Sequence, residues 1–140
     1  MAMSHELIHQ FKISHQSILE VMGEINRSIR SYPKVKPQLR DLHTKLLAHL
    51  GKQDDRLLAS LAQFFSADRE AGKMIEFLQV DLKDTKIKAL IFFDNHSGEM
   101  DDIRARNFPR HFTEFSAVMT GRIKLEEDYL FPLLAKIPPS

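Results

Sequence analysis

The chain has 140 residues and no cysteine, and its 20 basic and 19 acidic residues give a formal net charge of +1. The charges are interspersed, which argues against a nucleic-acid-binding protein, because such proteins concentrate Lys and Arg on one face. The lack of cysteine excludes disulfides and thiolate metal sites and favours a cytoplasmic location, and the longest apolar run, residues 89–93, is too short to cross a membrane.

Hydrophobic periodicity predicts four helices in one domain spanning residues 1–140. The first helix is expected over residues 4–31, ending before Pro33, because the residue before a proline disfavours helical backbone angles. Its seam comprises Phe11, His15, Ile18, Met22, Ile25 and Ile29. The second helix is expected to begin near Pro37, which suits a first turn, and to continue unbroken to about Phe65. Its inward stripe comprises Leu39, Leu42, Leu46, His49, Gln53, Leu57, Leu61 and Phe64.

The third helix is expected to follow a short connection over residues 66–68 and to run to about His96, with His96 capping its end before Gly98. Its apolar face comprises Met74, Phe77, Leu78, Leu82, Ala89, Phe92 and Phe93. The fourth helix is expected to open at Pro109, after a connection over residues 101–107. Its long face comprises Phe112, Phe115, Val118, Met119, Glu126, Leu130, Phe131 and Leu134. Short connections make neighbouring helices antiparallel, so we expect an all-α, up-down-up-down four-helix bundle.

One stretch of the sequence occurs twice. Residues 49–62 (HLGKQDDRLLASLA) align without gaps with residues 122–135 (RIKLEEDYLFPLLA). Each copy places a nitrogen-bearing side chain, His49 or Arg122, four residues before a polar one, Gln53 or Glu126. On a helix, such residues lie one turn apart on the same face. This pattern is typical of two helices that each offer a pair of side chains to one buried site.

Two histidines, His15 and His49, occupy seam positions that would normally be apolar. Burial of a polar group without a partner costs about 1–3 kcal/mol, so each imidazole is expected to have one. Two interpretations remain open. The rings could bond to a carboxylate or to each other, or they could share a metal ion, since imidazole is a common ligand of iron, zinc and copper.

The sequence resembles the hemerythrin-like (HHE cation-binding) family, most specifically in the segment EEDYLFPLL at residues 126–134, which is similar to that family's acidic pair followed by Leu-Phe-Pro-Leu. The resemblance implies a bundle around a non-haem di-iron centre. His15 and His49 match the histidines of the first and second helices, and Gln53 stands where the second helix is expected to supply a glutamate. Arg122 occupies the position of the fourth-helix histidine, while Glu126 retains the carboxylate.

The third-helix histidine of that family would fall near Phe77, with Glu76 or Asp81 as the nearest substitutes. The guanidinium of Arg122 stays charged and has no lone pair to offer, so it would repel a metal. We expect it to form a core ion pair with Glu126, joined by one of the two acidic residues of the third helix. The alternative is that the Arg122 side chain extends to the surface.

These departures predict a hemerythrin-like protein with a non-catalytic regulatory or sensing role and no metal or substoichiometric metal. A single ion held by His15, His49 and Glu126 would suit zinc or Fe(II). The alternative is a functional iron site, di-iron or mononuclear, for oxygen or nitric-oxide sensing, oxygen binding or iron handling. A third interpretation is a histidine phosphotransfer domain that uses His49, which requires an exposed imidazole.

Two aromatic pairs, Phe64-Phe65 and Phe92-Phe93, place side chains on more than one face of a helix. One member of each pair could form a surface for a partner protein or a homodimer.

Overall fold

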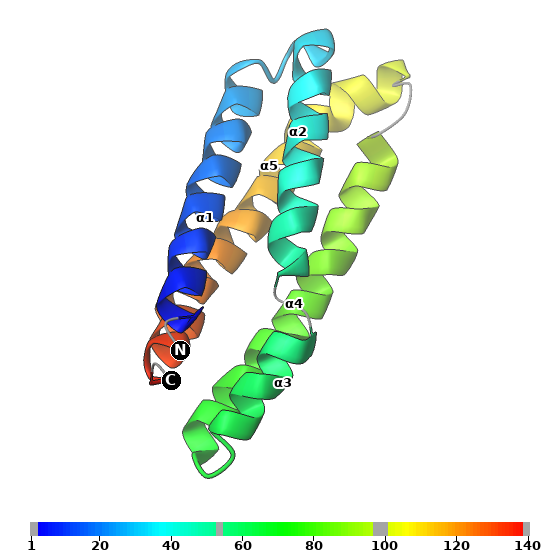
Figure 1. The fold of residues 1–140 in the computed structure, drawn as a ribbon. Helices are drawn as coiled ribbons and strands as arrows, with labels where there is room; N and C mark the ends of the chain where they lie inside the picture. The colour runs from blue at the N-terminus through cyan, green and yellow to red at the C-terminus, as the bar shows by residue number, and fades with distance from the viewer. Residues whose placement is uncertain (1–2, 53–54, 97–100, 139–140) are drawn as a thin grey trace.

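The computed structural model describes residues 3–52, 55–96 and 101–138, which are helical and contain no strand (Figure 1). The expected all-α class is therefore confirmed. Four helices of this described part have 20 residues or more: α1 (Met3–Arg27), α2 (Tyr32–Gly51), α4 (Arg69–His96) and α5 (Asp102–Leu125). The shorter elements are α3 (Asp55–Phe64), a π-helix η1 (Glu126–Leu130) and α6 (Phe131–Ala135).

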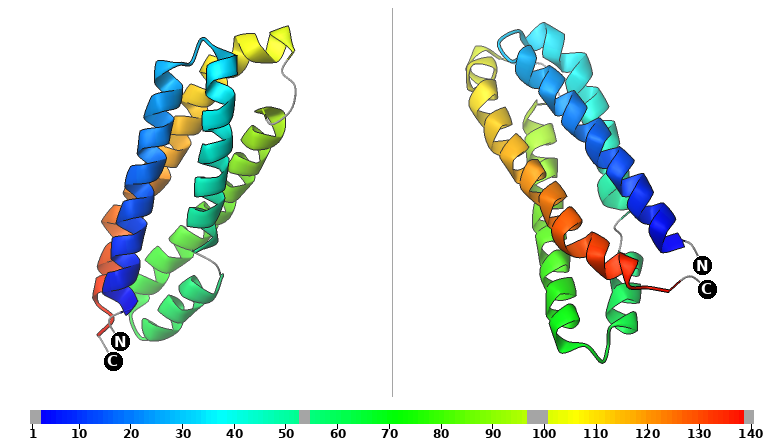
Figure 2. Two further views of the ribbon diagram at one scale, coloured as in Figure 1. Left: turned by 45° about the horizontal axis from the view of Figure 1, so that its top comes forward. Right: turned by 90° about the vertical axis from the view of Figure 1, so that its left-hand side faces the viewer.

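The long helices lie side by side around a common core (Figures 1 and 2). α1 packs chiefly against α2, and α4 packs chiefly against α5. The short helix α3 lies along the first half of α4, while η1 and α6 continue the line of α5 and pack against α1. Both chain ends lie at the same end of the molecule. No helix of the described residues has the length and apolar character needed to cross a bilayer.

The core is built from the faces that periodicity predicted. On α1, Phe11, Ile18 and Ile25 are completely buried, and on α5 the predicted residues Phe112 and Met119 are almost completely buried. Because these residues recur every seven residues, which is close to two helical turns, they lie on one face of each helix and form an apolar stripe towards its neighbours.

The second predicted helix is not continuous. α2 ends at Gly51, and α3 begins at Asp55. Glycine has low helix propensity, and aspartate favours helix ends over helix interiors. Gly51 and the two consecutive aspartates at positions 54 and 55 therefore account for the interruption of the predicted helix.

The buried stripe changes phase across this break. It now follows Leu58 and Leu61 of α3 and Phe65 just after α3, whereas Phe64, which was expected to face inward, is about half exposed. Phe77 of α4, also expected on the apolar face, is likewise about half exposed. Both Phe92 and Phe93 are buried, so neither contributes to a surface.

Two predicted helix starts were also wrong. α2 begins at Tyr32, not near Pro37, because Pro33 itself occupies the first turn, where proline is favoured. α5 begins at Asp102, not at Pro109, because Asp101 caps it: its side chain accepts a hydrogen bond from the backbone N–H of Arg104 at 2.8 Å. Pro37 lies inside α2, and Pro109 lies inside α5.

Candidate functional site

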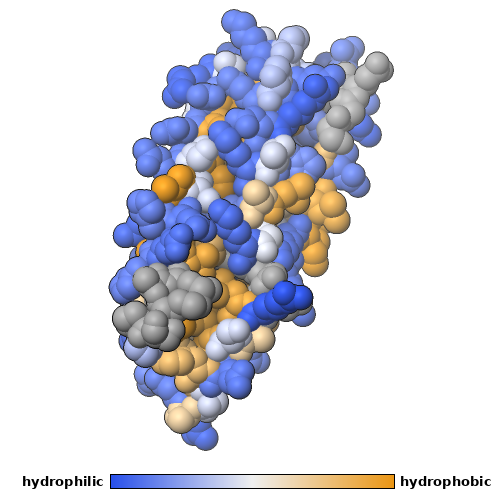
Figure 3. Space-filling view, viewed as in Figure 1, coloured by the Kyte–Doolittle hydropathy of each residue, from blue (hydrophilic) through white to orange (hydrophobic). Residues whose placement is uncertain are grey.

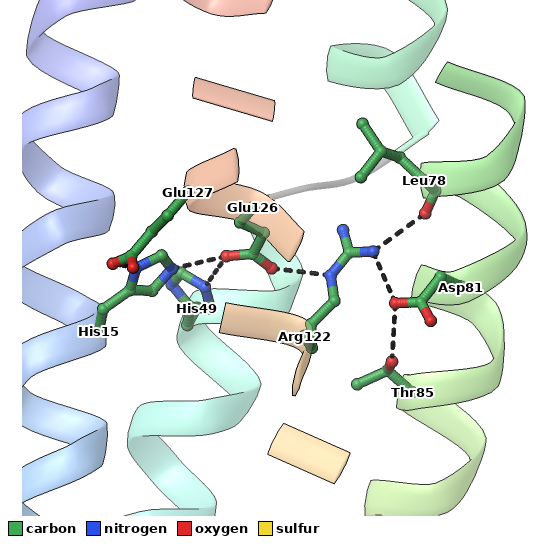
Figure 4. A network of polar contacts seen from close by, with 8 residues as sticks. All are labelled: His15, His49, Leu78, Asp81, Thr85, Arg122, Glu126 and Glu127. Atoms are coloured by element: carbon green, nitrogen blue, oxygen red, sulfur yellow. Dashed lines mark hydrogen bonds and ion pairs between the residues drawn. The ribbon is translucent and has the colours of Figure 1, made fainter. Parts of the chain in front are cut away.

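Three buried side chains from three different elements converge on one point of the core (Figure 4). His15 comes from α1, His49 from the last turn of α2, and Glu126 from the first position of η1. The Nε2 atoms of His15 and His49 lie 2.6 and 2.8 Å from the same carboxylate oxygen, Oε1 of Glu126. This carboxylate is the partner that the sequence required for both imidazoles.

The second oxygen of Glu126 binds a buried guanidinium. Arg122, one turn earlier on the same face, is 3% exposed, and its Nε donates to Oε2 of Glu126 at 2.8 Å. Its Nη1 donates to the backbone oxygen of Leu78 at 3.1 Å and to Oδ2 of Asp81 at 2.9 Å. Thr85 donates a further hydrogen bond to Asp81 at 3.4 Å. The predicted Arg122–Glu126 pair is present, and the surface position considered for Arg122 is not observed.

The π-helix shapes the other side of the site. In η1 the N–H of Phe131 bonds to the carbonyl of Glu126, five residues back, instead of four. The next residue, Pro132, has no N–H and its ring crowds the preceding turn, which accounts for the wider helix at this point. Within this segment Glu127 reaches Nδ1 of His15 at 3.0 Å, and the ring of Phe131 stacks on His15 with centroids 5.5 Å apart.

The electrostatics of the site follow from these contacts. Burial by itself raises the pKa of Glu126, but hydrogen bonds from His15 and His49 and the positive charges of His49 and Arg122 outweigh it and hold the pKa well below its usual range. Burial lowers the pKa of His15, but the hydrogen bonds and negative charges of Glu126 and Glu127 outweigh it and raise that pKa. Glu126 is therefore an ionised acceptor, and His15 favours the imidazolium form that donates from both ring nitrogens.

The donor set fits one metal ion and does not fit two. His15, His49 and Glu126 each offer one ligand atom, and these three atoms lie within 4.8 Å of one another. A cation there must displace the protons through which both imidazoles bond to Glu126, and it must tolerate the charge of Arg122 on the same carboxylate. Among the residues that the structure describes, this is the only such group of histidine and acidic side chains.

The remaining predicted site residues fall in different places. Gln53 lies outside the described residues. Asp81 faces the site but is bonded to Arg122, and Glu76 is exposed on the surface of α4. With Phe77 also exposed, α4 contributes the carbonyl of Leu78 and the carboxylate of Asp81, both of which suit a guanidinium.

Sequence reasoning missed Glu127 and Leu78 as participants in the site, and it gave His96 a different role from the observed one. Glu127 was noted only as half of an acidic pair, although the proline five residues later signalled a helix distortion that brings it to His15. Leu78 contributes a backbone oxygen, which no side-chain pattern reveals. His96, expected as a helix cap, is instead buried against Phe92 and Phe108 away from the site, and burial, His111 and Arg104 lower its pKa to about 4.

Comparisons with models of protein families, with curated proteins and with solved structures find no match to this chain.

Proposed function

We propose that this chain is a hemerythrin-like protein with a non-catalytic regulatory or sensing role, in which an arginine–carboxylate core replaces a di-iron centre. The proposal includes an antiparallel up-down-up-down arrangement of the four long helices and, because the chain has no cysteine, a cytoplasmic setting. Its metal content is none or substoichiometric.

The observation that carries the proposal is the buried position of Arg122. Its guanidinium is permanently charged, 3% exposed, and bonded to a carboxylate that is completely buried. A relative with two metal ions in this space would need a neutral imidazole at position 122 and further anionic ligands. Here the cationic side chain satisfies the carboxylate instead.

A second candidate function is the binding of a single cation, supported by the convergence of His15, His49 and Glu126. Two imidazoles and one carboxylate suit zinc or Fe(II) with positions left open for a small ligand such as oxygen or nitric oxide. The nearby positive charge of Arg122 makes such binding weak, because like charges repel strongly where water is excluded.

Histidine phosphotransfer receives less support. A phospho-accepting imidazole must be reached by its partner domain, whereas His49 is buried and bonded to Glu126. Protection of His49 from diethyl pyrocarbonate would agree with this argument, and rapid modification of His49 in the folded protein would restore phosphotransfer as a candidate.

The test is the metal content and visible spectrum of protein produced in iron-replete medium. We expect far less than two irons per chain for the wild type. Arg122→His removes the cation and adds a ligand, so it should raise iron or zinc content, whereas Lys124→His, an exposed position two residues later, should not. Two tightly held irons in the wild type would overturn the proposal. A gain limited to about one ion in the arginine variant would favour the single-cation site.

A further inference from the structure

Helix α4 carries an apolar surface that the bundle leaves uncovered. Five of its large apolar side chains are exposed, and the most exposed of them, Leu90, is 66% accessible. The five residues are Phe77, Val80, Ile87, Leu90 and Ile91. Figure 3 shows hydrophobic atoms gathered over the middle of α4 and the adjoining part of α2. A groove of about 300 Å³ runs between these helices and is lined by Leu47 and Leu90 among others.

This surface has the geometry of a helix–helix seam. Val80, Lys83, Ile87, Leu90 and Asp94 are exposed and follow one another at steps of three and four residues, so they lie along one outward face of α4. The apolar residues Ile87 and Leu90 occupy its middle, a basic residue lies on one side of them, and an acidic residue lies on the other. We name these five residues the α4 seam.

The charges of the α4 seam are available for a partner. Lys83 and Asp94 form no ion pair with any residue that the structure describes. In contrast, the neighbouring Lys88 and Asp84, which lie off the centre of the seam, already pair with each other at 2.9 Å.

The α4 seam is complementary to itself when two copies meet antiparallel. If Ile87 packs on Leu90 of the partner subunit, Leu90 packs on Ile87 of the partner subunit by the same symmetry. In that register Lys83 faces Asp94 of the partner subunit, and Asp94 faces Lys83 of the partner subunit. A shift by one heptad would place Asp94 opposite Glu76 of the partner subunit, which is repulsive, so the charges select one register.

We propose that the α4 seam binds a second copy of this chain and forms a two-fold symmetric dimer. An amphipathic helix of another protein could cover the apolar residues of the α4 seam. To pair with both Lys83 and Asp94, however, it would need an acidic and a basic residue at the same spacing, which a second copy of α4 already has when it lies antiparallel. The contact lies on the outward face of α4, opposite the Leu78 and Asp81 groups that hold Arg122, and it does not depend on the proposed function of the buried site.

The first test is the mass of the full chain in solution by analytical ultracentrifugation over a concentration series. We expect a reversible dimer for the wild type and a monomer for Leu90→Glu. Ile13→Glu is the matched control, because Ile13 is also strongly exposed, at 56%, but lies on α1. It should remain dimeric. A wild type that stays monomeric at millimolar concentration, or a Leu90→Glu variant that is folded by circular dichroism and still dimeric, would overturn the proposal.

The second test uses charge reversal at exposed positions, where folding is least at risk. Lys83→Asp and Asp94→Lys should each weaken the dimer by about tenfold or more, because each places two like-charge pairs across the interface. The double variant Lys83→Asp/Asp94→Lys should recover dimerisation. An equimolar mixture of the two single variants should form a heterodimer, since every pair across it is then of opposite sign. Failure of both the double variant and the mixture to dimerise would reject this register and with it the proposal.

Discussion

Replacement of Arg122 by methionine tests the central ion pair directly. The side chain of methionine fills a similar apolar volume but removes the charge, so Glu126 keeps its hydrogen bonds from both histidines and loses its guanidinium partner. Since Glu126 is completely buried, no water can take the place of Arg122. We expect Arg122→Met to lower the free energy of unfolding by about 3 kcal/mol.

This magnitude follows from the separate contacts of Arg122. The hydrogen bond from Nε to Glu126 is charged at both ends and shielded from solvent, which corresponds to about 1.5–3 kcal/mol. The bond to Asp81 contributes less, below about 1 kcal/mol, because the Asp81 side chain is 32% exposed and water can replace the guanidinium. The total lies at the lower end of the range of about 3–5 kcal/mol for breaking a buried pair, because the carboxylate retains its two imidazole donors.

The assay is urea unfolding followed by the helical circular dichroism signal, which suits a chain without tryptophan. Lys124→Met is the control, because it removes an exposed positive charge from the same turn and should change stability by less than about 0.5 kcal/mol. In a double-mutant cycle with Glu126→Gln, we expect a coupling energy of about 2 kcal/mol between the two residues. A loss below about 1 kcal/mol for Arg122→Met, or no measurable coupling, would refute the argument that this pair organises the core.

Three further outcomes are expected. Burial, His111 and Arg104 hold the pKa of His96 at about 4 in the folded chain, against 6.5 in the unfolded chain. The unfolded chain therefore binds more protons, and the free energy of unfolding should fall as the pH drops from 6.5 towards 4, by about 2 kcal/mol at pH 5. His96→Phe should remove this part of the pH dependence, as measured by urea unfolding across that window. Glu127→Gln should cost less than about 1 kcal/mol in urea unfolding at pH 7, because Glu127 is half exposed and water can replace it at His15; a larger loss would mean that it is more than a peripheral partner. Gly121→Ala should raise stability by about 0.5–1 kcal/mol in the same assay, since an added Cβ meets no atom within 4 Å and alanine is the better helix former; destabilisation would indicate a close contact there.

Much of the core and of the site could be predicted from the sequence, because helical periodicity determines which side chains share a face. The seam of α1 placed His15 among Phe11 and Ile18, and the spacing of four residues placed Arg122 beside Glu126. An ionised carboxylate cannot be buried alone, so the partners of Glu126 could be inferred once its inward position was known.

The helix ends were harder to predict, because they depend on local hydrogen bonds and turn residues that compete with periodicity. A proline can end one helix or open the next, and Pro33 opens α2 where the pattern suggested an end. Because Asp101 forms the N-cap, α5 begins at Asp102, about two turns before the predicted start at Pro109. After the break that follows Gly51, the buried face of the helix is shifted by one residue relative to the predicted one. For that reason Phe65 is buried, whereas the prediction placed Phe64 in the core.

The arrangement around Glu126 explains how a bundle interior can hold so much charge. The side chains of Glu127, His15, Glu126, Arg122 and Asp81 form a line of alternating sign that passes through the core, with a carboxylate at each end. The two outer carboxylates are partly exposed, at 48% and 32%, so the terminal charges remain solvated and only the inner ones must be neutralised by neighbours.

The same line connects the helices. His15 belongs to α1 and Asp81 to α4, while Glu126 continues α5 and also binds His49 of α2, so all four long helices meet at one level of the core. A metal ion at Oε1 of Glu126 would need to replace imidazole protons in the middle of this line, leaving two positive centres on a single carboxylate. Metal binding and the integrity of the arginine pair are therefore opposed, and any variant that increases metal uptake should do so by weakening the bond between Arg122 and Glu126.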